Sequence, residues 1–207
     1  GAIENAQKQV ESKNFQARKN VLQYDDVMNT QREIIYKQRR QVLDGEDIQN
    51  SIQIMLRSMI SGAVQGHMGE QKHMDTENFR EAIHSFRTMF LAPTDLVLSE
   101  EDLQKYDADG LTQLVLDKAV AAYQRKEQEI TPPLMRELER VIMLRVVDEY
   151  WMDHIDAMTE LRQGIGLRAY AQSDPVVAYK EEGYEMFEAM VAAIQEETLR
   201  RLFLVRL

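Results

Sequence analysis

The sequence predicts an all-α protein in which one long scaffold helix packs with a long antiparallel helical hairpin, and a subdomain of short helices is inserted between them. Three observations support this fold class. The 207 residues include only 9 Gly and 4 Pro. The chain is rich in Gln, Glu, Arg, Met, Leu and Ala, which favour helices. Apolar residues recur every three or four positions over long stretches, which is the helical period.

Charge and cysteine content exclude several classes of protein. The 25 basic and 35 acidic residues give a net charge of −10, which argues against nucleic-acid binding because phosphates require a surplus of cations. The absence of cysteine excludes disulfides, thiolate zinc sites and a cysteine nucleophile, and it suits a reducing cytoplasm. No apolar run is long enough to span a membrane and no signal peptide is recognisable. The start at Gly1, without Met, indicates a fragment of a longer chain.

Residues 1–44 predict a single long helix. The stretch from Ile3 to Leu43 contains neither Gly nor Pro, and Asp44-Gly45 is a helix stop. A helix of about 40 residues is roughly 60 Å long, so we expect a spine that contacts several neighbours in turn. Its seam is only weakly apolar, because Gln31 and Gln38 stand where a coiled coil would carry leucine. The seam consists of Val21, Tyr24, Met28, Gln31, Ile35, Gln38 and Val42.

Residues 45–130 predict a compact, acidic subdomain of short helices. A helix from Ile48 to Ile60 is expected to fray at the glycines that follow, and Asp75-Thr76 begins another helix that continues to Pro93. Ser99 and Asp102 resemble a capping box. Asp109-Gly110 predicts a turn before a further helix that begins at Leu111. The glycines of the fraying stretch are Gly62, Gly66 and Gly69.

Residues 131–207 predict the hairpin. Thr131 supplies an N-cap and Pro132 the first helical position. Gly164 and Gly166 are expected to break this helix, so that 167–172 forms a loop, and Asp174-Pro175 starts the return helix. Two long helices joined so closely must lie antiparallel.

No catalytic or metal site is predicted. The phosphate-loop, dinucleotide-binding, zinc-protease and serine-hydrolase motifs are absent. His67 and His73 are better explained as surface histidines than as metal ligands, because their spacing matches no ligand motif. Asp25 and Asp26 are adjacent on a helix and point about 100° apart, so we expect one to pair with a cation and the other to meet solvent or a partner.

Two other groups of residues have both a structural and a functional interpretation. The basic cluster Lys37, Arg39 and Arg40 fits a solvated helix face better than contact with acidic lipid or a partner's carboxylates. Trp151 and His154 lie on the apolar stripe of the hairpin's first arm, where packing is the first explanation. In the loop 167–172, by contrast, Leu167 and Tyr170 favour a binding role, because exposed loops rarely keep such residues without a partner.

Two blocks of sequence resemble the SecA family of bacterial preprotein translocation motors. The segments VESKNF (10–15), RKNVLQYDDVMN (18–29) and QREIIY (31–36) resemble the start of its helical scaffold. The segment LRQGIGLRAYAQ (161–172), followed by Asp174-Pro175, resembles the tip of its two-helix finger. The resemblance implies that 1–44 and 131–207 form the helical scaffold, with the finger in the second part, and that 45–130 form the helical wing.

The resemblance also implies functional residues. The long scaffold helix of the family touches the motor and preprotein cross-linking domains, and the finger enters the SecY channel and contacts unfolded preprotein. The Trp-x-x-His segment, here Trp151 and His154, belongs to a region that restrains ATP hydrolysis. The implied motor contacts are Tyr24, Asp25, Asp26 and Arg32. The implied finger tip consists of Leu167, Arg168, Ala169, Tyr170 and Ala171.

The family's cofactors are expected elsewhere. The resemblance places ATP and magnesium in motor domains before Gly1 and zinc in a tail after Leu207, so we expect no cofactor and no enzymatic activity in these residues. It implies a cytoplasmic protein, peripheral at the cytoplasmic face of the bacterial plasma membrane, where the parent meets anionic lipid. One alternative is a helical protein–protein adaptor unrelated to translocation. A more remote one is an enzyme with a buried carboxylate or histidine site.

Overall fold

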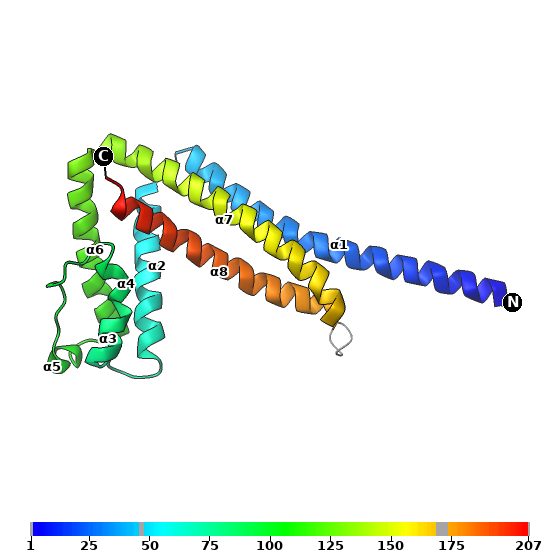
Figure 1. Ribbon diagram of the computed structural model, residues 1–207, viewed down its shortest axis with the longest axis horizontal. Helices are drawn as coiled ribbons and strands as arrows, with labels where there is room; N and C mark the ends of the chain where they lie inside the picture. Colours follow the sequence, from blue (N-terminus) through cyan, green and yellow to red (C-terminus); the bar gives the residue numbers. More distant parts are fainter. Residues whose placement is uncertain (1, 46–47, 169–173, 207) are drawn as a thin grey trace. The chain divides into compact units, whose positions relative to one another are not determined.

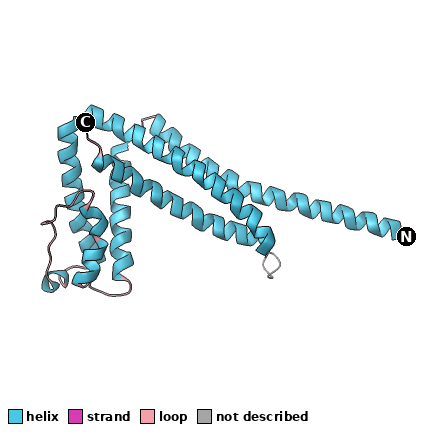
Figure 2. Cartoon of the chain, in the orientation of Figure 1, coloured by secondary structure: helices cyan, strands magenta, loops and turns pink. Residues whose placement is uncertain are grey.

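The computed structural model describes residues 2–45, 48–168 and 174–206, and within these ranges the chain is helical with no strand (Figures 1 and 2). The predicted all-α class is therefore confirmed. The described residues form eight helices, which are α1 (Ala2–Leu43), α2 (Ile48–Met68), α3 (Thr76–Ala82), α4 (His84–Arg87), α5 (Glu100–Leu103), α6 (Ala108–Ile130), α7 (Pro132–Arg168) and α8 (Pro175–Leu204).

The helices divide into two compact units. Unit 1 comprises residues 1–41 and 147–191, and unit 2 comprises residues 42–146 and 192–207. Helices α7 and α8 each contribute one part to unit 1 and another to unit 2.

Unit 1 consists of α1, the C-terminal part of α7 and the N-terminal part of α8. The single long helix predicted for the N-terminal region is confirmed, and α7 and α8 are antiparallel, also as predicted. A buried cluster forms between them from Met158, Ile165 and Tyr179, against which α1 packs. Residues 2–19 of α1 are all exposed, and in Figure 1 this part of the helix runs on beyond α7 and α8.

The predicted break of α7 at its two glycines is wrong. The helix continues through Gly164 and Gly166 to Arg168. Ile165, between them, is buried, and a glycine inside a helix costs only about 1 kcal/mol relative to alanine. The burial of Ile165 outweighs that cost. Leu167 and Arg168 consequently belong to the helix and not to a loop.

Unit 2 has a large apolar core. Helix α2 buries one residue per turn, at Ile52, Leu56, Ile60 and Val64, and packs against α6 and α3. The same buried cluster includes residues of α7 and of the end of α8. Burial of about 0.8 kcal/mol per methylene makes this cluster the main source of the unit's stability.

The predicted fraying of α2 is also wrong. The helix runs through Gly62 and Gly66 and ends at Met68, where Gly69 takes a left-handed conformation with φ of 57°. Both internal glycines face open space, whereas Val64 and Met68 continue the buried stripe. The apolar period therefore sets the length of the helix, and the left-handed glycine ends it.

The helix expected from Thr76 to Pro93 is two short helices. α3 ends at Ala82 and α4 begins at His84, with Ile83 between them. Ile83 is fully buried, as are Phe79 and Phe86 on either side. The three positions have the spacing of one helix face, and all three side chains enter the same core despite the interruption.

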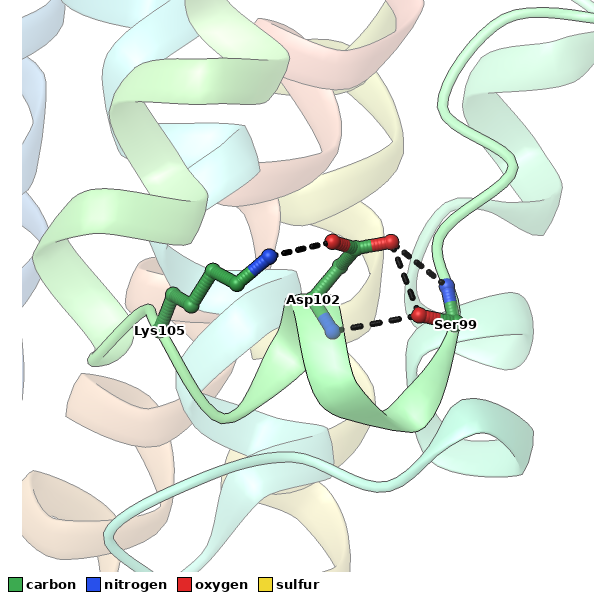
Figure 3. A network of polar contacts seen from close by, with 3 residues as sticks. All are labelled: Ser99, Asp102 and Lys105. Atoms are coloured by element: carbon green, nitrogen blue, oxygen red, sulfur yellow. Dashed lines mark hydrogen bonds and ion pairs between the residues drawn. The ribbon is translucent and has the colours of Figure 1, made fainter.

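The capping box predicted at α5 is confirmed. The Ser99 hydroxyl accepts a hydrogen bond from the Asp102 backbone N–H at 3.2 Å, and the Asp102 carboxylate accepts from the Ser99 backbone N–H at 3.3 Å (Figure 3). Lys105 donates to the same carboxylate. These hydrogen bonds, from Lys105 above all, lower the pKa of Asp102 to about 2.

The turn predicted at Asp109-Gly110 is instead the first turn of α6. Asp107 is the N-cap, and its carboxylate accepts from the Gly110 N–H at 2.8 Å. α6 ends at Thr131, whose φ is 88°, and Pro132 opens α7 as predicted.

Buried and half-buried polar groups lie where α6, α7 and α8 meet within unit 2. Arg136 on α7 forms ion pairs with Glu127 at 2.7 Å and with the fully buried Glu139 at 2.9 Å. Lys126 on α6 donates to the carbonyl oxygens of Phe203 and Val205, so it satisfies the C-terminal carbonyls of α8. Burial lowers the pKa of Lys126.

Candidate functional site

A buried hydrogen-bonded triad joins the three helices of unit 1. The Nε2 atom of His154 on α7 lies 2.7 Å from Oε1 of Gln31 on α1. The Gln31 amide donates in turn from Nε2 to the carbonyl oxygen of Gly183 on α8, at 3.2 Å. An amide oxygen can only accept, so His154 donates from Nε2. One glutamine side chain therefore ties α1 to both helices of the hairpin.

Aromatic rings enclose His154. The Trp151 ring stacks on it with centroids 5.6 Å apart, and Phe187 meets it edge-on at 5.8 Å. Burial lowers the pKa of His154, which keeps the imidazole neutral at pH 7. The sequence-based interpretation of Trp151 as a packing residue is confirmed, since it is buried with His154 in this cluster.

Gly183 packs closely against Met158 of α7. A Cβ atom at this position would lie 2.7 Å from Cε and 3.4 Å from Sδ of Met158 on α7. The backbone carbonyl of Gly183 accepts the hydrogen bond from Gln31. Sequence analysis missed this glycine and treated Gln31 only as a weak point of the seam. The one available signal was that both Gln31 and His154 lie on apolar stripes.

A second cluster lies nearer the described end of the hairpin. Arg162 on α7 forms an ion pair with Asp25 at 3.0 Å, and its guanidinium lies 5.0 Å from the centroid of the Tyr24 ring. Tyr24 meets Tyr179 of α8 edge-on at 4.9 Å. The expectation that one aspartate of the pair 25–26 binds a cation is confirmed for Asp25, although both aspartates are exposed.

The structure places the four residues implied as motor contacts in two environments. Tyr24 and Asp25 face α7 and α8. Asp26 is exposed, and Arg32 donates to Asn29 of its own helix at 2.9 Å.

The basic cluster on α1 is partly engaged within unit 1. Arg39 binds the Asp148 carboxylate of α7 with two hydrogen bonds of 2.9 and 3.1 Å, and this partner raises the pKa of Arg39. Lys37 and Arg40 are exposed. The cluster therefore contributes to the packing of α1 as well as to a solvated face.

The tip residues predicted from the sequence are only partly described. Leu167 lies in the last turn of α7 and is 78% exposed. The backbone of Arg168 ends that helix. Ala169, Tyr170 and Ala171 lie outside the described residues.

His67 and His73 each hydrogen-bond a backbone carbonyl through Nδ1, to Ala63 at 2.9 Å and to Tyr106 at 3.0 Å. Within residues 2–45, 48–168 and 174–206, no group of three or more His, Asp or Glu side chains lies close enough together to hold a metal ion. Across the same ranges, no helix combines the length and apolar character needed to cross a membrane.

Comparison with known proteins identifies the relatives of this chain. The family model described as the SecA Wing and Scaffold domain matches residues 1–206. The chain is 52% identical over 202 residues to the protein translocase subunit SecA of Clostridium novyi (strain NT), and the match covers 98% of this chain and 24% of that protein. It is 50% identical to the protein translocase subunit SecA 1 of Clostridioides difficile (strain 630), covering 98% of this chain and 22% of that protein.

A third relative, the protein translocase subunit SecA of Pelotomaculum thermopropionicum, is 48% identical over 204 residues, which is 99% of this chain and 23% of the relative. The chain thus spans about a quarter of the length of the curated relatives it matches.

Proposed function

Because the chain belongs to the SecA wing and scaffold domain family, we propose that it couples ATP-driven movement of motor domains to the passage of a preprotein through the SecY channel. In this proposal residues 1–44 and 131–207 are the scaffold and 45–130 the wing. The observation that carries the proposal is the long antiparallel pair of α7 and α8. This pair is anchored on α1 by buried side chains and has the exposed Leu167 near its turn.

The turn between α7 and α8 contacts the translocating polypeptide. An unfolded preprotein presents every kind of side chain, so the contact must tolerate any sequence. A tyrosine ring offers apolar area and one hydroxyl at a low cost in conformational entropy, which suits that requirement. Tyr170 is therefore assigned the main contact. The neighbouring contact residues are Leu167, Arg168, Ala169 and Ala171.

The N-terminal half of α1 binds the motor. It exposes Ile3, Val10, Phe15 and Leu22, and exposed apolar surface of this extent favours a partner. Asp26 and Arg32 extend that contact surface. Tyr24 and Asp25, which pack against α7 and α8, pass movement of α1 on to the hairpin. Trp151 and His154, which pack together and bind α1 through the hydrogen bond of His154 to Gln31, restrain ATP hydrolysis.

ATP, magnesium and zinc are bound, in this proposal, by parts of the translocase other than these 207 residues, and no catalytic residue is assigned here. The absence of cysteine and of a phosphate-loop motif supports that assignment. The partners are the motor and preprotein cross-linking domains, the SecY channel, unfolded preprotein and anionic lipid, with no nucleic acid. The site of action is the cytoplasmic face of the bacterial plasma membrane.

A chimera tests the proposal. The 207 residues replace the matching segment of the Clostridium novyi SecA, and ATP-dependent transport of a preprotein into inverted membrane vesicles carrying SecY is measured. We expect transport by the chimera, and a loss of at least tenfold on Tyr170→Ala with helical content unchanged. Tyr170→Phe, which keeps the ring, is the matched control and retains most of the transport.

Two results would count against the proposal. A folded chimera that hydrolyses ATP but transports no preprotein would show that the chain does not perform the coupling. Equal transport by the parent chimera and the Tyr170→Ala variant would remove the role assigned to the tip.

A further inference from the structure

Three polar pairs link α1 to α7 in unit 1. They are Asp25 with Arg162, Gln31 with His154 and Arg39 with Asp148. The 14 positions from Asp25 to Arg39 along α1 match the 14 positions from Arg162 back to Asp148 along α7. The two helices are therefore antiparallel, and the central pair lies within two positions of the register that the outer pairs set, because Gln31 is 6 positions from Asp25 and His154 is 8 positions from Arg162.

The central pair differs from the outer two. Gln31 and His154 are 6% and 5% exposed, whereas the side chains of both outer pairs are 38–52% exposed. Exposed ion pairs contribute little because water and salt screen them. A buried amide, by contrast, must keep its hydrogen bonds. The Gln31 side chain accepts a hydrogen bond from α7 through its oxygen and donates one to α8 through its nitrogen. Both α7 and α8 must therefore be in place for the buried amide to be satisfied.

A shift of α1 by one helical turn would break the triad. Gln31 would then lie opposite Met158 or Tyr150 in place of His154, because side chains four positions apart share a helix face. The amide would be buried without its partner. His154 would then lie opposite Ile35 or Val27 of α1, which offer no acceptor for its N–H. Buried polar groups are known to specify register in this way.

We infer that Gln31 is a positioning residue that fixes the register of α7 and α8 on α1, and through them the place along α1 of the end of α7 and the start of α8. The relevance of this register to transport rests on the proposed function, because the turn is where the preprotein is contacted. The register itself does not depend on the proposed function. The role differs from a contribution to stability, since an apolar side chain of similar size would fill the same space.

Spin-label distances measure the register directly. The chain has no cysteine, so labels can be attached at chosen positions without removing any residue. Glu33 on α1, Asp156 on α7 and Glu185 on α8 are exposed. Double electron–electron resonance is recorded for two label pairs, Glu33→Cys with Asp156→Cys and Glu33→Cys with Glu185→Cys. The parent chain is expected to give one narrow distance for each pair.

Three variants separate register from stability. Gln31→Met is nearly isosteric and apolar, and we expect a thermal midpoint lowered only by the loss of the two hydrogen bonds, with a second distance population displaced by about 5 Å, one helical turn. Gln31→Glu keeps an acceptor for His154 and loses the donor to Gly183, so the distance to α7 stays narrow and the distance to α8 broadens. His154→Gln can still donate to Gln31, so both distances stay narrow.

The inference is overturned by a folded Gln31→Met chain whose two distances remain narrow and centred as in the parent. It is equally overturned if His154→Gln broadens the distances as much as Gln31→Met. If Gln31→Met fails to fold, Gln31→Glu tests the inference instead. An unchanged distance from α1 to α8 in that variant would show that the hydrogen bond to Gly183 does not fix the register. The experiment contains no translocase, so its failure is distinct from failure of the proposed function.

Discussion

Each of the two units is stabilised internally by a different kind of interaction. Unit 2 buries a large apolar cluster drawn from seven helices, α2 to α8, with the aromatic rings of Phe86, Phe90 and Phe203 in contact. Unit 1 has three helices side by side, and its buried residues include the polar pair Gln31 and His154.

The difference shows how stability and register are supplied separately. An apolar core gains free energy in proportion to the area buried, but it accepts small displacements at little cost. A buried polar triad contributes little net free energy, yet it penalises every arrangement in which its members are apart. Unit 2 therefore supplies stability, and the triad of unit 1 supplies one defined arrangement of long helices.

The largest expected effect comes from truncation in the core of unit 2. Phe86→Ala should lower the free energy of unfolding by about 3–5 kcal/mol, because the buried ring leaves a cavity. Urea unfolding followed by circular dichroism measures the change. Ile54→Ala on the exposed side of α2 is the control and should change stability by less than about 0.5 kcal/mol. Similar losses for both variants would contradict the assignment of the core.

The second effect is a dependence of stability on pH that arises from Glu139 in unit 2. Burial raises the pKa of Glu139 from its usual 4.5 to about 7. Arg136 binds one carboxylate oxygen, while the other oxygen has no hydrogen-bond partner among the described residues. The folded state thus holds a proton that the unfolded state releases above pH 4.5, so stability is greatest at low pH and falls as pH rises toward 7.

The magnitude follows from about 1.4 kcal/mol per pKa unit, which gives a loss on the order of 2–3 kcal/mol between pH 5 and pH 8. Glu139→Gln should remove most of this dependence in urea unfolding at the two pH values. An equally steep loss in the variant would assign it to another group.

Unit 1 is expected to respond in the opposite direction. Burial lowers the pKa of His154, so the unfolded state binds a proton first as pH falls below the usual 6.5. Stability from this residue is present above pH 6.5 and is lost at lower pH. Trp151 is the only tryptophan and lies in unit 1, so its fluorescence follows this loss while circular dichroism follows both units.

The smallest effect concerns two glycines in helices of unit 1. A methyl group added at Gly164 would face open space. Gly164→Ala should therefore stabilise the chain by about 0.5–1 kcal/mol, because alanine has the higher helix propensity. Gly183→Ala should lack this gain or destabilise by about 1 kcal/mol, because the new methyl must displace Met158. Thermal unfolding of the two variants gives the difference. In a Met158→Ala background, which removes the clash, Gly183→Ala should stabilise the chain as Gly164→Ala does. Equal changes in stability for the two glycine variants in the parent chain would refute the close approach.

The sequence predicted the long helices and most of their ends. Absence of Gly and Pro marked α1, while Asp174-Pro175 and Ser99 marked helix starts that the structure confirms. It failed at Gly62 and Gly164, because the cost of a helical glycine is local whereas the burial that offsets it depends on tertiary packing.

The site was harder to predict from the sequence than the helices. Gln31 and His154 are 123 positions apart, and the Gly183 carbonyl that completes the triad is a backbone atom. A polar residue on an apolar stripe signals a buried partner but does not identify it. Arg162, which joins Asp25 and Tyr24, could likewise be found only once the register of α1 and α7 was known.

The separation of stability from register is tested most directly by measuring two variants with the same two methods. Urea unfolding and the spin-label distance from α1 to α7 are recorded for Phe86→Ala and Gln31→Met. The account predicts that Phe86→Ala lowers the unfolding midpoint strongly and keeps one narrow distance, whereas Gln31→Met lowers the midpoint less and gives a second distance. A Gln31→Met chain that loses stability while its distance stays narrow would contradict the account.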